Sequence, residues 1–348
     1  MFWKEAYKEG LYMTLDNKTV LITGSNGFIG SNLAARLLEK YENIHIVGVD
    51  NMNDYYDVSL KEYRLNRLNS LNKDYKFIKG DISDKQFVEK LFEDNRFDIV
   101  VNLAAQAGVR YSIDHPDVYI NSNVIGFYNI LEAVRYHPIE HLLYASSSSV
   151  YGGNKKVPFS TDDKVDNPVS LYAATKKTNE LMAYTYCHLY GIKTTGLRFF
   201  TVYGPAGRPD MAYFSFTNKL IKDEKIRIFN FGKCERDFTY IDDIIEGIER
   251  IMLKGPKEDY NVYNIGNSHP ENLMDFVYTL ANALIDNGIL DKDFNIDEHM
   301  ELVEMQPGDV PVTYSDTSPL EHDYGFRPST SLKEGLNSFA KWYKEFYR

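Results

Sequence analysis

Short apolar segments alternate with helical segments over about the first 200 residues, and this alternation constrains the fold more than any other feature. Six segments have the length and apolar character of buried parallel strands, at residues 18–24, 44–50, 75–82, 97–105, 141–148 and 192–200. Helices are predicted between them, including residues 121–136 and a long helix that begins at Pro168 and ends at Gly191. The sequence therefore predicts an α/β fold, with a Rossmann-type, doubly wound parallel sheet covered by helices on both faces.

Three glycines follow the first predicted strand directly. Gly24, Gly27 and Gly30 allow a tight turn and let a pyrophosphate approach the N-terminus of the next helix. Asp50 ends the second strand, 20 residues after Gly30, where a carboxylate can bind a ribose diol and repel a 2′-phosphate. The combination predicts NAD rather than NADP as the cofactor, and a tight turn without a ligand is the alternative. Asp81 and Ile82 are expected near the adenine, although Asp81 could instead cap a helix.

The strand–helix pattern weakens after Tyr203, and this change predicts a second, smaller lobe. Residues 204–211 have a loop-like composition, and from about residue 267 short helices alternate with loops. We expect residues 1–203 and about 237–266 to form the NAD-binding domain. Residues from about 204 to 236 and from 267 to 348 are expected to form a mixed lobe that binds the substrate.

A tyrosine and a lysine lie four residues apart on the long predicted helix. This spacing places Tyr172 and Lys176 on one helix face, where the ammonium would lower the pKa of the phenol and make it a usable base. In isolation such a pair is most often a surface pair. Four serines, at positions 146–149, end the fifth strand, however, where ligands of open α/β sheets bind.

Together these motifs resemble a known family. The glycine turn, Asn102–Ala105, the serine run before Val150-Tyr151-Gly152 and the Tyr172/Lys176 pair are similar to extended short-chain dehydrogenases/reductases, and more narrowly to nucleotide-sugar 4-epimerases. The resemblance extends from about Lys18 to Tyr347. It implies a tightly bound NAD and a catalytic triad of Ser147, Tyr172 and Lys176. The expected cofactor contacts are Gly24, Gly27, Phe28, Ile29, Gly30, Asp50, Asn51, Asp81, Ile82, Leu103, Ala104, Ala105, Asn123, Tyr172, Lys176 and Phe199.

Other segments resemble UDP-glucuronate 4-epimerases in particular, namely Arg198–Pro205, Gly207–Met211 and Gln306–Thr313. Ser148 and Ser149 stand where related dehydratases and decarboxylases carry acidic residues, which favours epimerisation. The resemblance implies that Arg208 and Arg236 bind the substrate, with a salt bridge to the second lobe as the alternative for each, and that Asp309 binds the uridine ribose. Ser148, Ser149 and Thr201 are candidates for holding the sugar carboxylate. The alternatives are a UDP-glucose or UDP-N-acetylglucosamine 4-epimerase, a nucleotide-sugar decarboxylase or dehydratase, a reductase that uses free cofactor, and an NAD-binding regulator without turnover.

Composition excludes several other classes. The net charge of −11 argues against a nucleic-acid partner, whose binding depends largely on neutralising phosphates. The chain has only two cysteines and no apolar run of membrane-spanning length, so we expect a cytoplasmic protein without membrane contact. The histidines suggest no metal site. The resemblance also implies a homodimer formed through two helices of each subunit.

Overall fold

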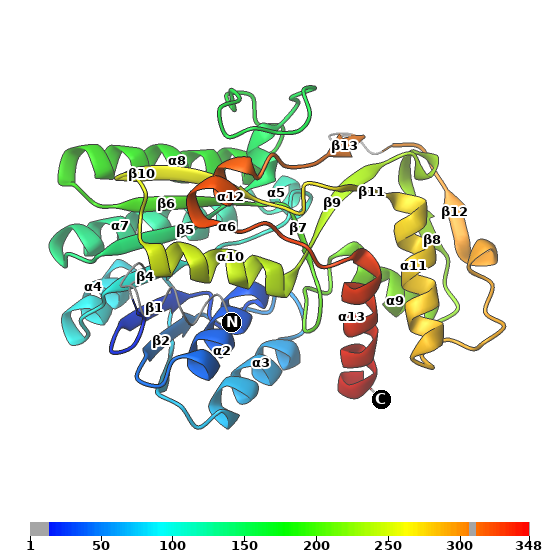
Figure 1. Ribbon diagram of the computed structural model, residues 1–348, viewed down its shortest axis with the longest axis horizontal. Coiled ribbons are helices and arrows are strands. Elements are labelled where there is room, and N and C mark those ends of the chain that lie inside the picture. The colour runs from blue at the N-terminus through cyan, green and yellow to red at the C-terminus, as the bar shows by residue number, and fades with distance from the viewer. Residues whose placement is uncertain (1–13, 306–310, 348) are drawn as a thin grey trace.

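The computed structural model of the protein describes residues 14–305 and 311–347. Its core is a seven-stranded parallel sheet (Figure 1) made of β1 (Thr19–Thr23), β2 (His45–Asp50), β3 (Tyr75–Lys79), β4 (Ile99–Asn102), β5 (His141–Ser147), β6 (Thr194–Phe199) and β10 (Tyr260–Ile265). The strand order is β10-β6-β5-β4-β1-β2-β3, so the chain winds first to one side of β1 and then to the other. The predicted doubly wound α/β fold is confirmed.

Helices cover both faces of this sheet because its strands are apolar on both sides. Val20 and Ile22 of β1 pack with α2 (Phe28–Lys40), α10 (Ile241–Lys254) and α12 (Ser318–Tyr324). Leu21, which points the other way, packs with α4 (Lys85–Asp94), α7 (Gly126–Tyr136) and α8 (Leu171–Tyr190). Helix α3 (Val58–Ser70) packs beside α2.

Two predicted helices differ from expectation at their first turns. The long helix α8 begins at Leu171 rather than Pro168, because the Ser170 hydroxyl caps it by accepting a hydrogen bond from the Ala173 N–H at 3.1 Å. It ends at Gly191, which adopts a left-handed conformation with φ 67°. The helix predicted over 121–136 starts as a π-helical turn over Ile120–Ile125 and then continues as α7.

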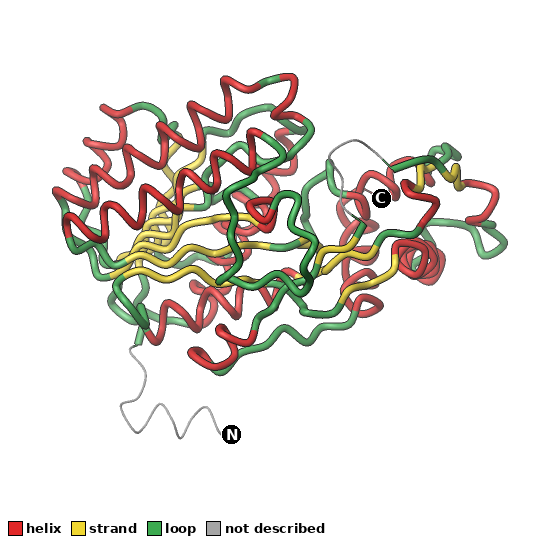
Figure 2. The backbone as a smooth tube through the Cα atoms, turned by 90° about the horizontal axis from the view of Figure 1, so that it is seen from above, coloured by secondary structure: helices red, strands yellow, loops and turns green. Residues whose placement is uncertain are grey.

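A second lobe lies beyond the carboxyl end of the sheet and is visible on the right in Figure 2. Its small sheet contains β7 (Thr201–Tyr203), β9 (Glu235–Tyr240), β11 (Pro270–Asn272) and β13 (Val312–Thr313), and a separate pair joins β8 (Ile226–Ile228) to β12 (Met300–Leu302). Helices α9 (Ala212–Leu220), α11 (Leu273–Asp286) and α13 (Leu332–Tyr347) pack around an apolar core rich in aromatic residues. Helix α12 crosses back and packs on α10 and β10 of the large sheet.

Within residues 14–305 and 311–347, no helix is long and apolar enough to cross a membrane. The same part of the chain contains no group of three or more His, Cys, Asp or Glu residues arranged to hold a metal ion.

Candidate active site

A cavity lies at the carboxyl ends of the central strands, where the strand order reverses. It brings together most of the residues that the sequence singled out: Gly24, Gly27, Phe28, Ile29, Gly30, Asp50, Asn51, Asp81, Ile82, Leu103, Ala104, Ala105, Ser147, Tyr172, Lys176, Phe199 and Arg208. Asn123, Ser148, Ser149, Thr201 and Arg236 do not contribute to its lining. Asp309 and Gln306 lie outside the described residues.

The glycine turn is packed too closely against backbone atoms to accept larger residues at Gly24 and Gly30. Gly24 has φ 70°, and a Cβ added there would lie 2.8 Å from the Ala104 nitrogen. A Cβ on Gly30 would lie 2.2 Å from the Gly24 carbonyl oxygen. Gly27 caps helix α2 and has no side chain to occupy the first N–H groups. Because uncapped amides at a helix N-terminus attract anions, this turn fits the pyrophosphate of a dinucleotide.

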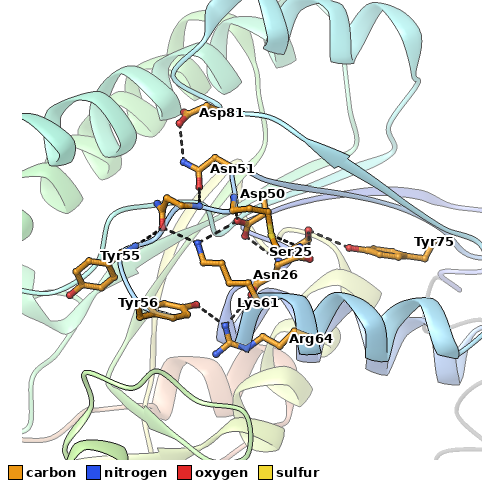
Figure 3. A network of polar contacts seen from close by, with 12 residues as sticks. Ser25, Asn26, Asp50, Asn51, Tyr55, Tyr56, Lys61, Arg64, Tyr75 and Asp81 are labelled. Atoms are coloured by element: carbon orange, nitrogen blue, oxygen red, sulfur yellow. Dashed lines mark hydrogen bonds and ion pairs between the residues drawn. The ribbon is translucent and has the colours of Figure 1, made fainter. Parts of the chain in front are cut away.

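Asp50 lies beside this turn at the end of β2 and is 7% exposed. Its carboxylate accepts hydrogen bonds from the Asn26 N–H at 3.2 Å and from the Met52 N–H at 2.9 Å. Lys61, on α3, places its ammonium 3.7 Å from the same carboxylate (Figure 3). Burial lowers the pKa of Lys61, and the charge of Asp50 acts in the opposite direction. The acid and the cation therefore both face the end of the cavity where a ribose diol is expected.

Asp81 lies next to Asn51 rather than at a helix terminus. It accepts a hydrogen bond from the Asn51 amide at 2.9 Å and two more from the backbone and hydroxyl of Ser83. Burial acts in the other direction, but these hydrogen bonds lower the pKa of Asp81 overall. The cap of α4 is instead Asp84, which accepts from the Gln86 and Phe87 N–H groups. The alternative in which Asp81 caps that helix is therefore wrong.

Arg64, on the same helix as Lys61 and beside it in Figure 3, joins the glycine turn to the second lobe. Its guanidinium is 1% exposed and donates to the Asn26 carbonyl at 3.0 Å and to the Tyr56 hydroxyl at 2.7 Å. On its other side it donates to the carbonyl oxygens of Ala206 and Gly207, at 2.6–3.0 Å. Gly207 directly precedes Arg208, so Arg64 connects the cofactor turn to the loop that carries a predicted substrate-binding residue.

Ser147, Tyr172 and Lys176 meet on the floor of the cavity. The Tyr172 phenol takes part in a hydrogen bond with Ser147. Burial raises the pKa of Tyr172, while the Ser147 hydrogen bond and the positive charge of Arg208 act in the opposite direction. The Lys176 ammonium donates to the Ala145 carbonyl at 2.9 Å, and burial lowers its pKa to about 8. The expectation that Lys176 lowers the pKa of Tyr172 is not met in this structure, where the cation acting on the phenol is Arg208.

Arg208 reaches the cavity from the loop after β7. Its guanidinium pairs with the Asp210 carboxylate through a hydrogen bond of 3.0 Å from Nε to Oδ1 and a second one from Nη2. Tyr55 also lines the cavity, and its hydroxyl donates to Asp210 Oδ2 at 3.4 Å. Arg208 therefore links the catalytic phenol, an acid that holds it in place and the open cavity.

The other predicted substrate residues surround this site without lining the cavity. Ser148 and Ser149 lie in a 3-10 turn over Ser148–Tyr151, and Ser147 caps that turn by accepting from the Ser149 N–H at 3.1 Å. Thr201 begins β7 and is half-buried. Arg236 lies on β9 and donates to the carbonyl oxygens of Glu235 and Pro311, both at 3.0 Å.

Asn123 is engaged with the protein itself. Its side-chain oxygen accepts from the Gln106 N–H at 2.8 Å, and its amide donates to the Gln106 carbonyl and to the Thr175 hydroxyl, both at 3.0 Å. The contacts support a positioning role, in which Asn123 holds the chain after β4 against α8.

Three further residues at the site, Tyr55, Lys61 and Arg64, were not predicted from the sequence. A signal for Arg64 does exist: Leu60, Arg64 and Leu68 lie at four-residue intervals on the buried face of α3. A charged residue in an apolar repeat indicates a buried polar partner. Nothing comparable marks Tyr55, because it lies on a loop whose placement depends on the second lobe.

Comparisons with known proteins gave matches over nearly the whole chain. The family model described as GDP-mannose 4,6 dehydratase matches residues 21–339. UDP-glucuronate 4-epimerase 4 of Arabidopsis thaliana is 44% identical over 345 residues, covering 94% of this chain and 76% of that protein. The solved UDP-glucuronic acid 4-epimerase from Bacillus cereus, in complex with UDP-glucuronic acid and NAD, is 31% identical with a TM-score of 0.83, covering 94% of this chain and 100% of that one. The UDP-glucose 4-epimerase from Thermotoga maritima, with UDP-glucose, is 28% identical with a TM-score of 0.81, covering 95% and 100%.

Proposed function

This chain belongs to the family of GDP-mannose 4,6-dehydratases and related NAD-dependent epimerases and dehydratases, and from that premise we propose that it interconverts UDP-glucuronate and UDP-galacturonate. NAD is the cofactor, held tightly in the cavity around the glycine turn. In this proposal the large-sheet domain carries NAD, while residues of about 204–236 and 267–348 bind the UDP-sugar.

One observation carries the proposal. Ser147, Tyr172 and Lys176 line one cavity, and the two residues that follow Ser147 are not acidic. Ser148 and Ser149 occupy the turn directly after Ser147. A serine hydroxyl cannot serve as a general acid or base near neutral pH, so it supports neither dehydration nor acid-assisted decarboxylation. Epimerisation at C4 needs only a proton acceptor, a hydride acceptor and a bound sugar.

The protein residues supply the proton chemistry. When bound, NAD would supply the hydride transfer to and from C4 of the sugar. Tyr172 accepts the proton of the C4 hydroxyl and returns it after the sugar has turned over. Ser147 and Arg208 stabilise the phenolate form that this step requires. With a pKa of about 8, Lys176 is protonated at neutral pH, and its ammonium donates to the Ala145 carbonyl at the end of β5.

The substrate sugar imposes a further requirement on the site. Oxidised glucuronate is a β-keto acid, which loses carbon dioxide when the bond to the carboxylate stands perpendicular to the ketone plane. An epimerase must therefore hold the carboxylate away from that orientation. We assign this role to the hydroxyl groups of Ser148, Ser149 and Thr201. Arg208 and Arg236 bind the substrate, with Asp309 on the uridine ribose.

The proposal is tested by incubating the purified protein separately with UDP-glucuronate, UDP-glucose and UDP-N-acetylglucosamine, and following each product by NMR. We expect conversion of UDP-glucuronate to UDP-galacturonate with little carbon dioxide. Tyr172→Phe serves as the matched inactive control. Brisk conversion of UDP-glucose together with inactivity on UDP-glucuronate would overturn the sugar assignment and support the second candidate, a UDP-glucose 4-epimerase, which the solved relative from Thermotoga maritima favours.

We also propose that two copies of the chain form a dimer through α7 and α8. These helices pack against each other, and large apolar side chains are exposed on them and on the preceding turns: Ile120, Ile125, Tyr128, Tyr136, Leu181, Tyr184, Leu189 and Tyr190. Contiguous exposed apolar side chains usually mark an interface. The same face of a second copy can cover these side chains, because a two-fold symmetric dimer buries the same patch of both subunits.

Light scattering after size-exclusion chromatography tests the dimer. The double variant Leu181→Glu/Tyr184→Glu should elute as a monomer, because both side chains are 57% exposed and would be buried in the dimer. Leu302→Glu, on β12 of the other lobe and 52% exposed, is the matched control and should remain dimeric. A monomeric wild-type protein would refute this interface.

A further inference from the structure

A buried ion pair lies directly behind the candidate catalytic residues. Glu180 of α8 and Arg198 of β6 form a two-bond pair, with Nε–Oε1 at 2.8 Å and Nη2–Oε2 at 2.9 Å. Their side chains are 1% and 4% exposed. Removing both charges from water costs several kcal/mol, so a buried ion pair is weak evidence for stability. The pair needs another explanation, and its remaining contacts supply one.

Both ends of the serine segment are tied to this one ion pair. At the first end, the Ser146 hydroxyl donates to Glu180 Oε1 at 2.7 Å. At the second end, Arg198 Nη1 donates to the Tyr151 hydroxyl at 3.0 Å. Tyr151 in turn donates to the Asn264 side-chain oxygen at 2.6 Å. The residues between these two anchors are Ser147, Ser148, Ser149 and Val150.

Helix α8 contacts the end of β5 at regular intervals. Tyr172, Lys176 and Glu180 follow one another at four-residue spacing and therefore share one helix face. Tyr172 meets Ser147, Lys176 donates to the Ala145 carbonyl, and Glu180 accepts from Ser146. Three consecutive residues of β5 are thus each paired with one residue of this face. Glu180 is the member of the set that also reaches β6, through Arg198.

We propose that the Glu180–Arg198 pair is a positioning device, which fixes the segment from Ser147 to Ser149 between two anchors so that the hydroxyl groups stay aligned with Tyr172 and with the sugar carboxylate. This inference rests on the proposed function and deepens it. Glu180, Arg198 and Tyr151 act through the serines rather than on the substrate. Loosening either anchor should therefore slow proton transfer and let the carboxylate reach the orientation in which carbon dioxide is lost.

The sharpest test is Tyr151→Phe. This variant removes one hydroxyl and leaves the aromatic ring, which stacks on Phe159 at a centroid distance of 4.5 Å. It deprives Arg198 Nη1 of its acceptor at the second anchor. We expect kcat to fall by about tenfold, equivalent to about 1.4 kcal/mol, with a smaller change in KM, because a hydrogen bond to a charged group is lost. The share of 4-keto pentose among the products should rise, and the bound NAD should be unchanged.

Lys177→Ala is the matched control. Lys177 contacts the same Glu180 carboxylate, at 3.3 Å, but from the half-exposed outer side and without any link to the serine segment. It should leave kcat and the product ratio unchanged. Ser146→Ala loosens the first anchor instead, and it takes over the test if Tyr151→Phe does not fold.

Thermal unfolding separates positioning from plain stability. A lower melting temperature with unchanged kcat and unchanged product ratio in the anchor variants would overturn the proposal. If the wild-type protein does not convert UDP-glucuronate, the sugar assignment fails by itself. The positioning role is then scored by kcat on whichever UDP-sugar the wild-type protein does epimerise.

Discussion

Asp50→Asn should remove the preference for NAD over NADP. In the structure the Asp50 carboxylate accepts two backbone hydrogen bonds, from Asn26 and Met52, and lies 3.7 Å from the Lys61 ammonium. Asparagine has the same shape but only one acceptor oxygen, so it can keep one of these two backbone hydrogen bonds and loses the other. The variant loses the negative charge and one acceptor, and Lys61 loses its counter-ion.

The expected size follows from these contacts. A ribose hydroxyl bonded to a carboxylate contributes about 1.5–3 kcal/mol, so the Kd for NAD should rise by roughly 10- to 150-fold. A 2′-phosphate about 4 Å from Asp50 would meet a repulsion on the order of 4 kcal/mol per unit charge at an effective dielectric constant of 20. The variant lacks this repulsion but retains Lys61, so the Kd for NADP should fall. Together these changes lower the discrimination between the cofactors by about 100-fold or more.

The assay is a fluorescence titration of cofactor-free protein with NADH and NADPH. Asp54→Asn is the matched control, because Asp54 is an exposed acid of the same loop that does not line the cavity. It should change neither Kd appreciably. Equal affinities of the wild-type protein for the two cofactors would refute the reasoning, as would a loss of affinity in Asp50→Asn that is the same for both.

Three further predictions concern the catalytic cluster. Tyr172→Phe should retain folding and bound NAD but lower turnover by about 100-fold or more, the scale of a lost general base, when product formation is followed by NMR; near-wild-type turnover would remove Tyr172 from the mechanism. Lys176 has a folded-state pKa of about 8, against an ordinary value of 10.5. Between these two pH values the unfolded chain binds more protons than the folded chain. The contribution of Lys176 to the free energy of unfolding therefore rises with pH across that window. The free energy of unfolding should be measured with denaturant for the cofactor-free wild type and for Lys176→Met. Between pH 7.5 and 10.5 the difference between the two proteins should shift by up to about 3 kcal/mol in favour of the wild type. A constant difference would contradict the burial of a charged amine. Thr201→Ala and Ser149→Ala should each raise the share of 4-keto pentose formed from UDP-glucuronate by about tenfold, measured by NMR, and an unchanged share would exclude these hydroxyls from restraining the carboxylate.

The first six strands were predictable because their signal is local. Each is a short apolar run followed by polar or glycine-containing segments, and the glycine turn after β1 has a fixed relation to Asp50. The seventh strand, β10, was missed because Tyr260–Ile265 alternates aromatic and apolar residues with asparagines. It lies at the edge of the sheet, where one side of the strand has no neighbour, and its apolar signal is correspondingly weak.

Which charges act on Tyr172 was less predictable from the sequence than which residues form the site. The spacing of Tyr172 and Lys176 correctly placed both in one cavity. It could not reveal that Lys176 is turned toward the Ala145 carbonyl, or that Arg208, 36 residues after Tyr172, is the cation acting on the phenol. Such contacts depend on how the second lobe packs against the sheet, and no local pattern encodes that packing.

The bridge made by Arg64 has a thermodynamic consequence. One buried guanidinium holds the glycine turn through Asn26 and the loop before Arg208 through Ala206 and Gly207. If this bridge couples the two binding sites, the free energy by which NAD favours UDP-sugar binding must equal that by which the UDP-sugar favours NAD retention. NAD, which must stay bound over many turnovers, would then dissociate most slowly while the sugar is bound. This is also the period in which the keto intermediate could leave the site.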